Sequence, residues 1–181
     1  DGKKKRLNEI LSTIKLISVL FSGVILLKTF SGKNYAVFDA RNYLFFMLIL
    51  IATLFLSILY YYWAFVWMKR TNPKNIYKII AVESVVFLVA FFAIVLVTGA
   101  NQSPYKAIFL FTIITSTIQS GLGFGIKIAA MSSAFVLGAD LAFSFNEPIY
   151  IFFETDLIIC AVFFLTAWSL GYYVKIESEY I

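Results

Sequence analysis

The chain has 181 residues, of which 61% are hydrophobic and only 14% are charged, whereas a soluble domain averages about 45–50% apolar and about 25% charged. A water-soluble globule of this size could not bury so much apolar surface, so the composition excludes an ordinary soluble enzyme, a disordered chain and a disulfide scaffold. The net charge is +5, and its basic residues lie at the ends of apolar stretches, which indicates lipid rather than nucleic acid as the partner.

Long, continuous apolar stretches predict an all-α, polytopic membrane protein, because a β-barrel would show short alternating segments instead. We expect residues 1–181 to form a single transmembrane domain, a bundle of six helices. In chain order they cover about 7–30, 42–68, 75–99, 104–120, 123–145 and 148–174.

Individual helices have distinct signatures. The first follows the basic cluster Lys3, Lys4, Lys5, Arg6, and the second ends in an aromatic belt typical of a membrane interface, Tyr60 to Trp67. The fourth is shorter than the roughly 20 residues that a span needs, so we expect protein to surround it.

Six spans place both termini on the same side of the membrane. With the termini in the cytoplasm, 11 basic residues lie inside and 4 lie outside. Cytoplasmic loops carry the excess of Lys and Arg, so the pattern predicts this orientation.

Polar side chains recur on single faces of the fourth and fifth helices. The fourth has Thr112, Thr115, Ser116 and Gln119, and the fifth has Ser133, Asp140 and Ser144. Helical spacing predicts that each set faces the bundle interior. Two interpretations remain open: hydrogen bonds between helices, or a pocket for water or a small-molecule ligand.

Three carboxylates should lie at similar depth in the outer half of the membrane. Asp140 is near the end of the fifth helix, and Glu154 and Asp156 are near the start of the sixth. Residues two apart point to nearly opposite sides of a helix, so at most one of the last two can face Asp140. The outer bases Arg41 and Lys106 are candidate counter-charges. These carboxylates form either a sensing site or interfacial ion pairs.

Small residues recur every four positions along the fifth helix, a pattern that lets helix backbones approach closely. We expect helix packing at two such series: Gly121, Gly125 and Ala129, and, one position further, Ala130, Ala134 and Gly138.

The sequence offers no candidate catalytic residue, metal ligand or cofactor motif. It contains no histidine, and its single cysteine, Cys160, lies inside an apolar stretch. The glycines at 121, 123 and 125 lack the strand–helix context of a dinucleotide fingerprint, so they indicate a tight turn.

Residues 103–141, SPYKAIFLFTIITSTIQSGLGFGIKIAAMSSAFVLGADL, resemble the membrane region of sporulation-type bacterial sensor histidine kinases. Gln119 stands where that family has a basic residue. The matching positions are Thr115, Ser116, Thr117, Ile118, Gln119, Gly121, Gly125, Ser132, Ser133 and Asp140.

The resemblance implies a sensing input domain in the bacterial cell membrane, which dimerises through its last helix and relays a stimulus to a cytoplasmic kinase core. The residues that we expect to carry sensing are Gln119, Ser133, Asp140, Glu154 and Asp156. Two alternatives remain: a small-molecule-binding membrane subunit of a vitamin-type importer, in which Ala130, Ala134 and Gly138 would dock a partner, and a membrane scaffold without a ligand.

Overall fold

The computed structural model describes residues 2–32, 40–67, 73–143 and 150–179, and within these ranges all regular structure is helical. The chain divides into two compact units, Asp1–Asn72 and Pro73–Ile181. Helices suit the membrane because each one satisfies its own backbone N–H and C=O groups where no water is present.

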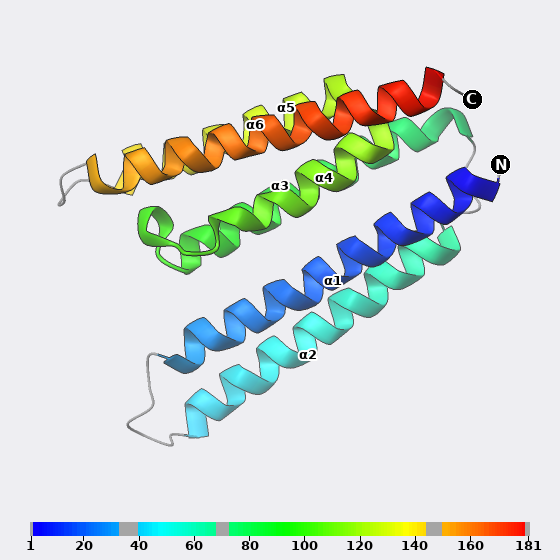
Figure 1. The fold of residues 1–181 in the computed structure, drawn as a ribbon. Helices are drawn as coiled ribbons and strands as arrows, with labels where there is room; N and C mark the ends of the chain where they lie inside the picture. Colours follow the sequence, from blue (N-terminus) through cyan, green and yellow to red (C-terminus); the bar gives the residue numbers. More distant parts are fainter. Residues whose placement is uncertain (1, 33–39, 68–72, 144–149, 180–181) are drawn as a thin grey trace. The chain divides into compact units, whose positions relative to one another are not determined.

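The first unit is a pair of antiparallel helices, α1 (Gly2–Gly32) and α2 (Ala40–Tyr62), shown in blue and cyan in Figure 1. After Tyr62 the second helix continues as a π-helix, Trp63–Trp67. The two helices come close at Gly23, where an added Cβ would overlap the side chain of Thr53. Gly23 is therefore the small residue that allows the two backbones to approach.

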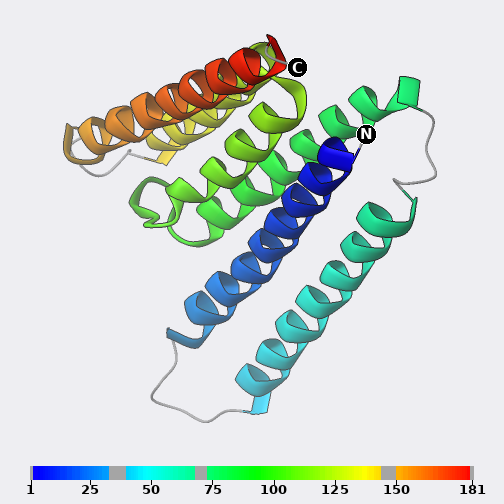
Figure 2. The same cartoon turned by 45° about the vertical axis from the view of Figure 1, so that its right-hand side comes forward.

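The second unit contains α3 (Pro73–Val97), α4 (Phe109–Ser120), α5 (Leu122–Phe143) and α6 (Tyr150–Glu179). Successive helices alternate in direction, as Figures 1 and 2 both show. The buried ring of Phe109 joins three of the helices, because it meets Phe91 of α3 edge-on at 6.5 Å and Phe163 of α6 edge-on at 6.2 Å.

Two glycines in the left-handed region set the turns of this unit. Gly99 has a φ of 123° just after α3, and Gly121 has a φ of 82° between α4 and α5. Glycine adopts such angles without the steric cost that a Cβ adds. The Gly121 N–H donates to the carbonyl of Thr117 at 2.8 Å, which closes the end of α4 before α5 begins.

Within the described ranges, five helices are long and apolar enough to cross a membrane. The predicted all-helical class is confirmed, and these helices agree with the predicted membrane character. The stretches are Arg6–Phe30, Phe46–Phe65, Tyr77–Val97, Leu122–Phe143 and Phe153–Glu177. Lys106–Ser120 is apolar but shorter than a full span, as expected from the sequence. A sixth crossing and the orientation of the termini remain predictions.

Three boundaries differ by five residues from those expected. The first helix was expected from residue 7, but α1 begins at Gly2. The fourth helix was expected from residue 104, but α4 begins at Phe109, because two short 3-10 turns, Ala100–Gln102 and Lys106–Ile108, precede it. The sixth was expected to end near 174, but α6 continues to Glu179, because its polar last residues retain helical hydrogen bonding beyond the apolar stretch. The expected helix ends at 68, 144–145 and 148–149 lie outside the described residues.

Candidate functional site

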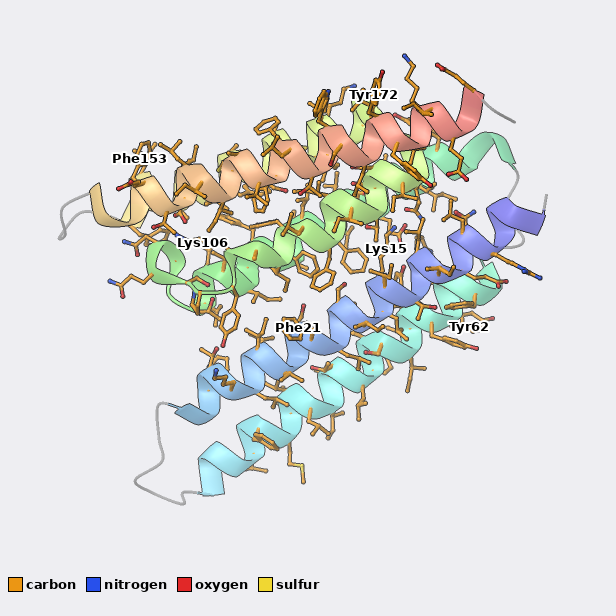
Figure 3. All side chains as sticks on the ribbon, viewed as in Figure 1. Lys15, Phe21, Tyr62, Lys106, Phe153 and Tyr172 are labelled. Carbon is orange, nitrogen blue, oxygen red and sulfur yellow. The ribbon has the colours of Figure 1, made fainter. Side chains whose placement is uncertain are left out.

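Lys106 reaches into the second unit from the turns that join α3 to α4. The turns are held by the hydroxyls of Thr98 and Ser103, which hydrogen-bond to each other at 2.6 Å. The Ser103 hydroxyl also accepts from the backbone N–H of Tyr105 at 3.3 Å. Lys106 lies in the second 3-10 turn, just before α4, and its side chain is only 4% exposed. Figure 3 shows it beside the first turns of α6, where Phe153 is labelled.

The ammonium group of Lys106 has an acceptor for each of its three N–H bonds. It donates to the carbonyl of Asn101 at 2.6 Å, to Oδ1 of Asp140 at 3.4 Å and, in a short contact, to Oδ2 of Asp156. These groups come from the turn after α3, from α5 and from α6. A single charged side chain thus connects three separate elements of the unit.

Both carboxylates in this cluster are almost completely buried, Asp140 at 1% exposed and Asp156 at 2%. Buried charges are costly to remove from water unless they are paired and hydrogen-bonded. One ammonium and two carboxylates sum to −1, so pairing alone leaves one negative charge uncompensated. Oδ2 of Asp140 is buried and has no hydrogen-bond partner among the described residues.

The layer next to the cluster is tightly packed and mostly apolar. Phe109, Val136 and Phe163 are fully buried there, and the Cys160 thiol approaches the carbonyl of Ser133 at 3.9 Å. Apolar surroundings strengthen the interaction between the charges of the cluster and also raise the cost of leaving any charge unpaired.

The structure brings together two of the five residues that the sequence singled out for sensing. Asp140 and Asp156 share Lys106, whereas Glu154 is exposed on α6. The two-residue spacing predicted that at most one of Glu154 and Asp156 could face Asp140, and the structure places Asp156 there. Ser133 is buried two turns before Asp140 on α5. Gln119 lies in the last turn of α4, thirteen residues or about 20 Å along the chain from Lys106. Whether these residues sense a stimulus remains a prediction.

The polar face of α4 is buried and largely satisfied within its own helix. The hydroxyls of Thr115, Ser116 and Thr117 donate to carbonyls four residues earlier, at 2.8, 2.5 and 2.6 Å. Hydroxyl groups in membrane helices commonly make such bonds to the preceding turn. The oxygen atoms of Thr112 and Ser133 are buried without a hydrogen-bond partner among the described residues.

The two small-residue series of α5 lie in different surroundings. Gly125 is buried, and an added Cβ would overlap the side chain of Thr117 on α4. Ala130, Ala134 and Gly138 are exposed on α5, and a Cβ added to Gly138 would meet nothing within 4 Å. Gly125 of the first series therefore allows close packing within the α4–α5 hairpin, while the second series lies on an exposed face.

Sequence reasoning missed two contributors. Asn101 binds Lys106 through its backbone carbonyl, which no side-chain pattern can reveal. Gly171 of α6 packs against the start of α5, where an added Cβ would lie 2.6 Å from the Cα of Leu122. In the sequence, a single glycine within an apolar helix is the feature that could have indicated this close contact between α5 and α6. Lys106 itself was expected only as a counter-charge.

Among residues 2–32, 40–67, 73–143 and 150–179, no group of histidine, cysteine, aspartate and glutamate side chains has the arrangement to hold a metal ion. In comparisons with known proteins, no family, no curated protein and no solved structure matches this chain.

Proposed function

We propose that this chain is the membrane-embedded input domain of a sensor histidine kinase in the bacterial cell membrane, and that α6 relays a stimulus to a cytoplasmic kinase core. The observation that carries the proposal is the continuity of α6. It runs without a break from the turn that holds Asp156 to Glu179, two residues past the apolar stretch Phe153–Glu177. The 23 residues between these two positions correspond to about 35 Å of helix.

Two contacts connect α6 to its neighbours at opposite ends. Asp156 joins it to Lys106 and, through Lys106, to Asp140 of α5. Gly171 packs closely on Leu122 at the start of α5. A change at the charge cluster would therefore tilt or rotate α6 about the Gly171 contact. A stimulus acts in this way only if it favours one packing over the other, because equal affinity for both shifts nothing.

An exposed apolar face of α6 supports dimerisation through this helix. Leu165, Trp168 and Tyr172 follow helical spacing and are each more than half exposed. The rings of Trp168 and Tyr172 stack at 6.3 Å. We place the contact between two copies of the chain on this face.

The relay is tested by distances between spin labels in lipid vesicles. With Cys160 replaced by serine, one label is placed at exposed Ile126 near the start of α5 and the other at exposed Ile176 near the end of α6. Lys106→Met, which breaks the cluster, should shift or broaden the measured distance distribution. Lys78→Met, an exposed lysine on α3, is the matched control and should leave it unchanged. An identical distribution in the Lys106 variant would contradict the relay.

The kinase assignment needs a separate measurement, because this chain contains no histidine to phosphorylate. The product of the whole gene is incubated with ATP in native membrane vesicles. We expect phosphoryl transfer to a histidine beyond this chain, at a rate that Lys106→Met changes and Lys78→Met does not. Absence of a phosphorylated histidine would refute the kinase while leaving the movement of α6 to be judged by the label distances.

A second candidate, the substrate-binding membrane subunit of a vitamin-type importer, is favoured by the exposed face of Ala130, Ala134 and Gly138. Small residues on an exposed membrane face allow a helix of another subunit to approach closely. Native mass spectrometry of the purified chain distinguishes the two functions, since an importer subunit should retain a bound vitamin-sized molecule and the proposed sensor should not.

A further inference from the structure

We infer that Lys106, Asp140 and Asp156 together form a site that binds and releases a single proton. The inference deepens the proposed function, since it names the ligand of the site on which the relay would act. It rests on the arrangement of the three side chains in the second unit and on the unpaired oxygen of Asp140.

The net charge of the cluster is the first observation in favour of a bound proton. The three N–H bonds of the Lys106 ammonium all have acceptors, which is the pattern of a fully protonated lysine. Two carboxylates and one ammonium then leave a charge of −1 among side chains that are at most 4% exposed. Adding one proton to the pair of carboxyl groups makes the cluster neutral, which removes the cost of a buried net charge.

One carboxylate oxygen of the cluster lacks a hydrogen-bond donor within the described ranges. Lys106 has no N–H left to offer, and Oδ2 of Asp140 has no hydrogen-bond partner among the described residues. A buried carboxylate oxygen without a donor is costly. A proton bound there would convert this oxygen from an unsatisfied acceptor into a hydroxyl group. Because both carboxyl groups share one ammonium, the proton belongs to the pair rather than to either residue.

A metal cation fits the cluster less well than a proton. The position between the two carboxylates is already occupied by the Lys106 ammonium, which would repel a second cation in these apolar surroundings. A proton needs no coordination shell and can bind to a single oxygen.

Among the described residues, few other titratable groups lie near the cluster. On α6 the Cys160 thiol lies one turn beyond Asp156, and Glu154 points outward. Tyr105 precedes Lys106 in the turn and is half-buried. The charged residues of α3, Lys78 among them, lie in its first half, far along the helix from the turn after Gly99. The exchangeable proton is therefore carried by the two carboxyl groups of the cluster.

The proton is tested by infrared spectroscopy of the purified chain in lipid vesicles, where a protonated carboxyl group absorbs separately from a carboxylate. At neutral pH, where exposed carboxyl groups are ionised, the native chain should show a band for one protonated carboxyl that disappears in alkaline buffer. Asp140→Asn and Asp156→Asn should each lose the band, because one carboxylate and one ammonium are already neutral together. Lys106→Met should roughly double the band, since two carboxyl groups then need two protons. Glu154→Gln, the exposed neighbour, should retain the native band.

A native spectrum without a protonated carboxyl band at any pH from mildly acidic upward would overturn the inference, and that result requires no variant to fold. Persistence of the band in Asp140→Asn would also overturn it. So would loss of the band when sodium replaces choline at fixed pH, because that result indicates a metal cation instead. None of these measurements requires α6 to move, so the proton site and the relay can fail independently.

Discussion

The two units of this chain place their polar side chains in contrasting ways. In the first unit, hydroxyls bond to their own helix: Ser57 donates to Thr53 and Thr53 to Ile49, each at 2.8 Å. In the second unit, the Lys106 ammonium bonds to groups from the turn after α3, from α5 and from α6. A local bond stabilises a helix in any surroundings, whereas the Lys106 bonds exist only in one arrangement of the bundle.

This contrast indicates where the molecule can switch between packings. A local hydroxyl bond such as those of Thr53 and Ser57 in α2 contributes little, so the helix loses little stability when one of them is removed. A buried charge cluster depends on all of its members together, because each partner that is lost leaves another charge unpaired. The second unit is therefore where a small chemical change should have a large structural effect.

The largest expected effect comes from Lys106→Met, which removes the shared cation, so that both buried carboxyl groups must take up a proton or remain as unpaired charges. Breaking a buried ion pair in this way costs about 3–5 kcal/mol, so the thermal unfolding midpoint of the solubilised chain should fall steeply at neutral pH. The matched variant Lys78→Met should leave it unchanged.

Replacing the two carboxyl groups as well should restore the stability that Lys106→Met loses. Combining Lys106→Met with Asp140→Asn and Asp156→Asn removes every charge of the cluster, and such complete replacement is often close to neutral in stability. Most of the lost stability should return. A triple variant no more stable than Lys106→Met would mean that the cluster is not the source of the effect.

An intermediate effect is expected at the second contact of α6. In Gly171→Ala the new Cβ would lie 2.6 Å from the Cα of Leu122, and backbone cannot move aside as a flexible side chain can. Overpacking of this kind costs about 1–3 kcal/mol. Gly138→Ala, on the exposed face of α5, should instead gain about 0.5–1 kcal/mol from better helix propensity. Midpoints that shift in the same direction for both variants would contradict the close crossing.

The smallest effect is expected in the first unit. Ser57→Ala removes the bond to the Thr53 carbonyl, and hydrogen bonds within membrane proteins average about 0.6 kcal/mol. The unfolding midpoint should barely change. A loss comparable to that of Lys106→Met would remove the distinction between the two units.

Much of the fold follows from the sequence, because long apolar stretches bounded by bases have few alternatives to membrane helices. The short fourth helix was expected from its length alone. Its start was misplaced, because the 3-10 turns before Phe109 depend on contacts such as Lys106 with the Asn101 carbonyl. The same ammonium also contacts Asp140 of α5 and Asp156 of α6, which lie 34 and 50 residues further along the chain, and local sequence cannot reveal such contacts.

The candidate site was predictable in outline and not in detail. Depth along the helices placed all three carboxylates at one level, and the two-residue spacing implied that only one of Glu154 and Asp156 could face Asp140, without indicating which. Residue spacing alone could not predict which of the two small-residue series of α5 packs against another helix. Gly125 meets Thr117, whereas Ala130 and its series remain exposed, and only the position of α4 determines that choice.

The short fourth helix also sets how strongly a membrane voltage would act on the cluster. Lys106–Ser120 covers 15 residues, or about 22 Å at about 1.5 Å per residue. In a hydrocarbon layer about 30 Å thick, a helix of this length whose Ser120 end lies level with one surface has its Lys106 end about 8 Å below the other. A proton entering from that nearer surface would cross roughly a quarter of the electric field. At 100 mV this corresponds to about 0.6 kcal/mol per charge, so an energised membrane would change proton occupancy by about threefold.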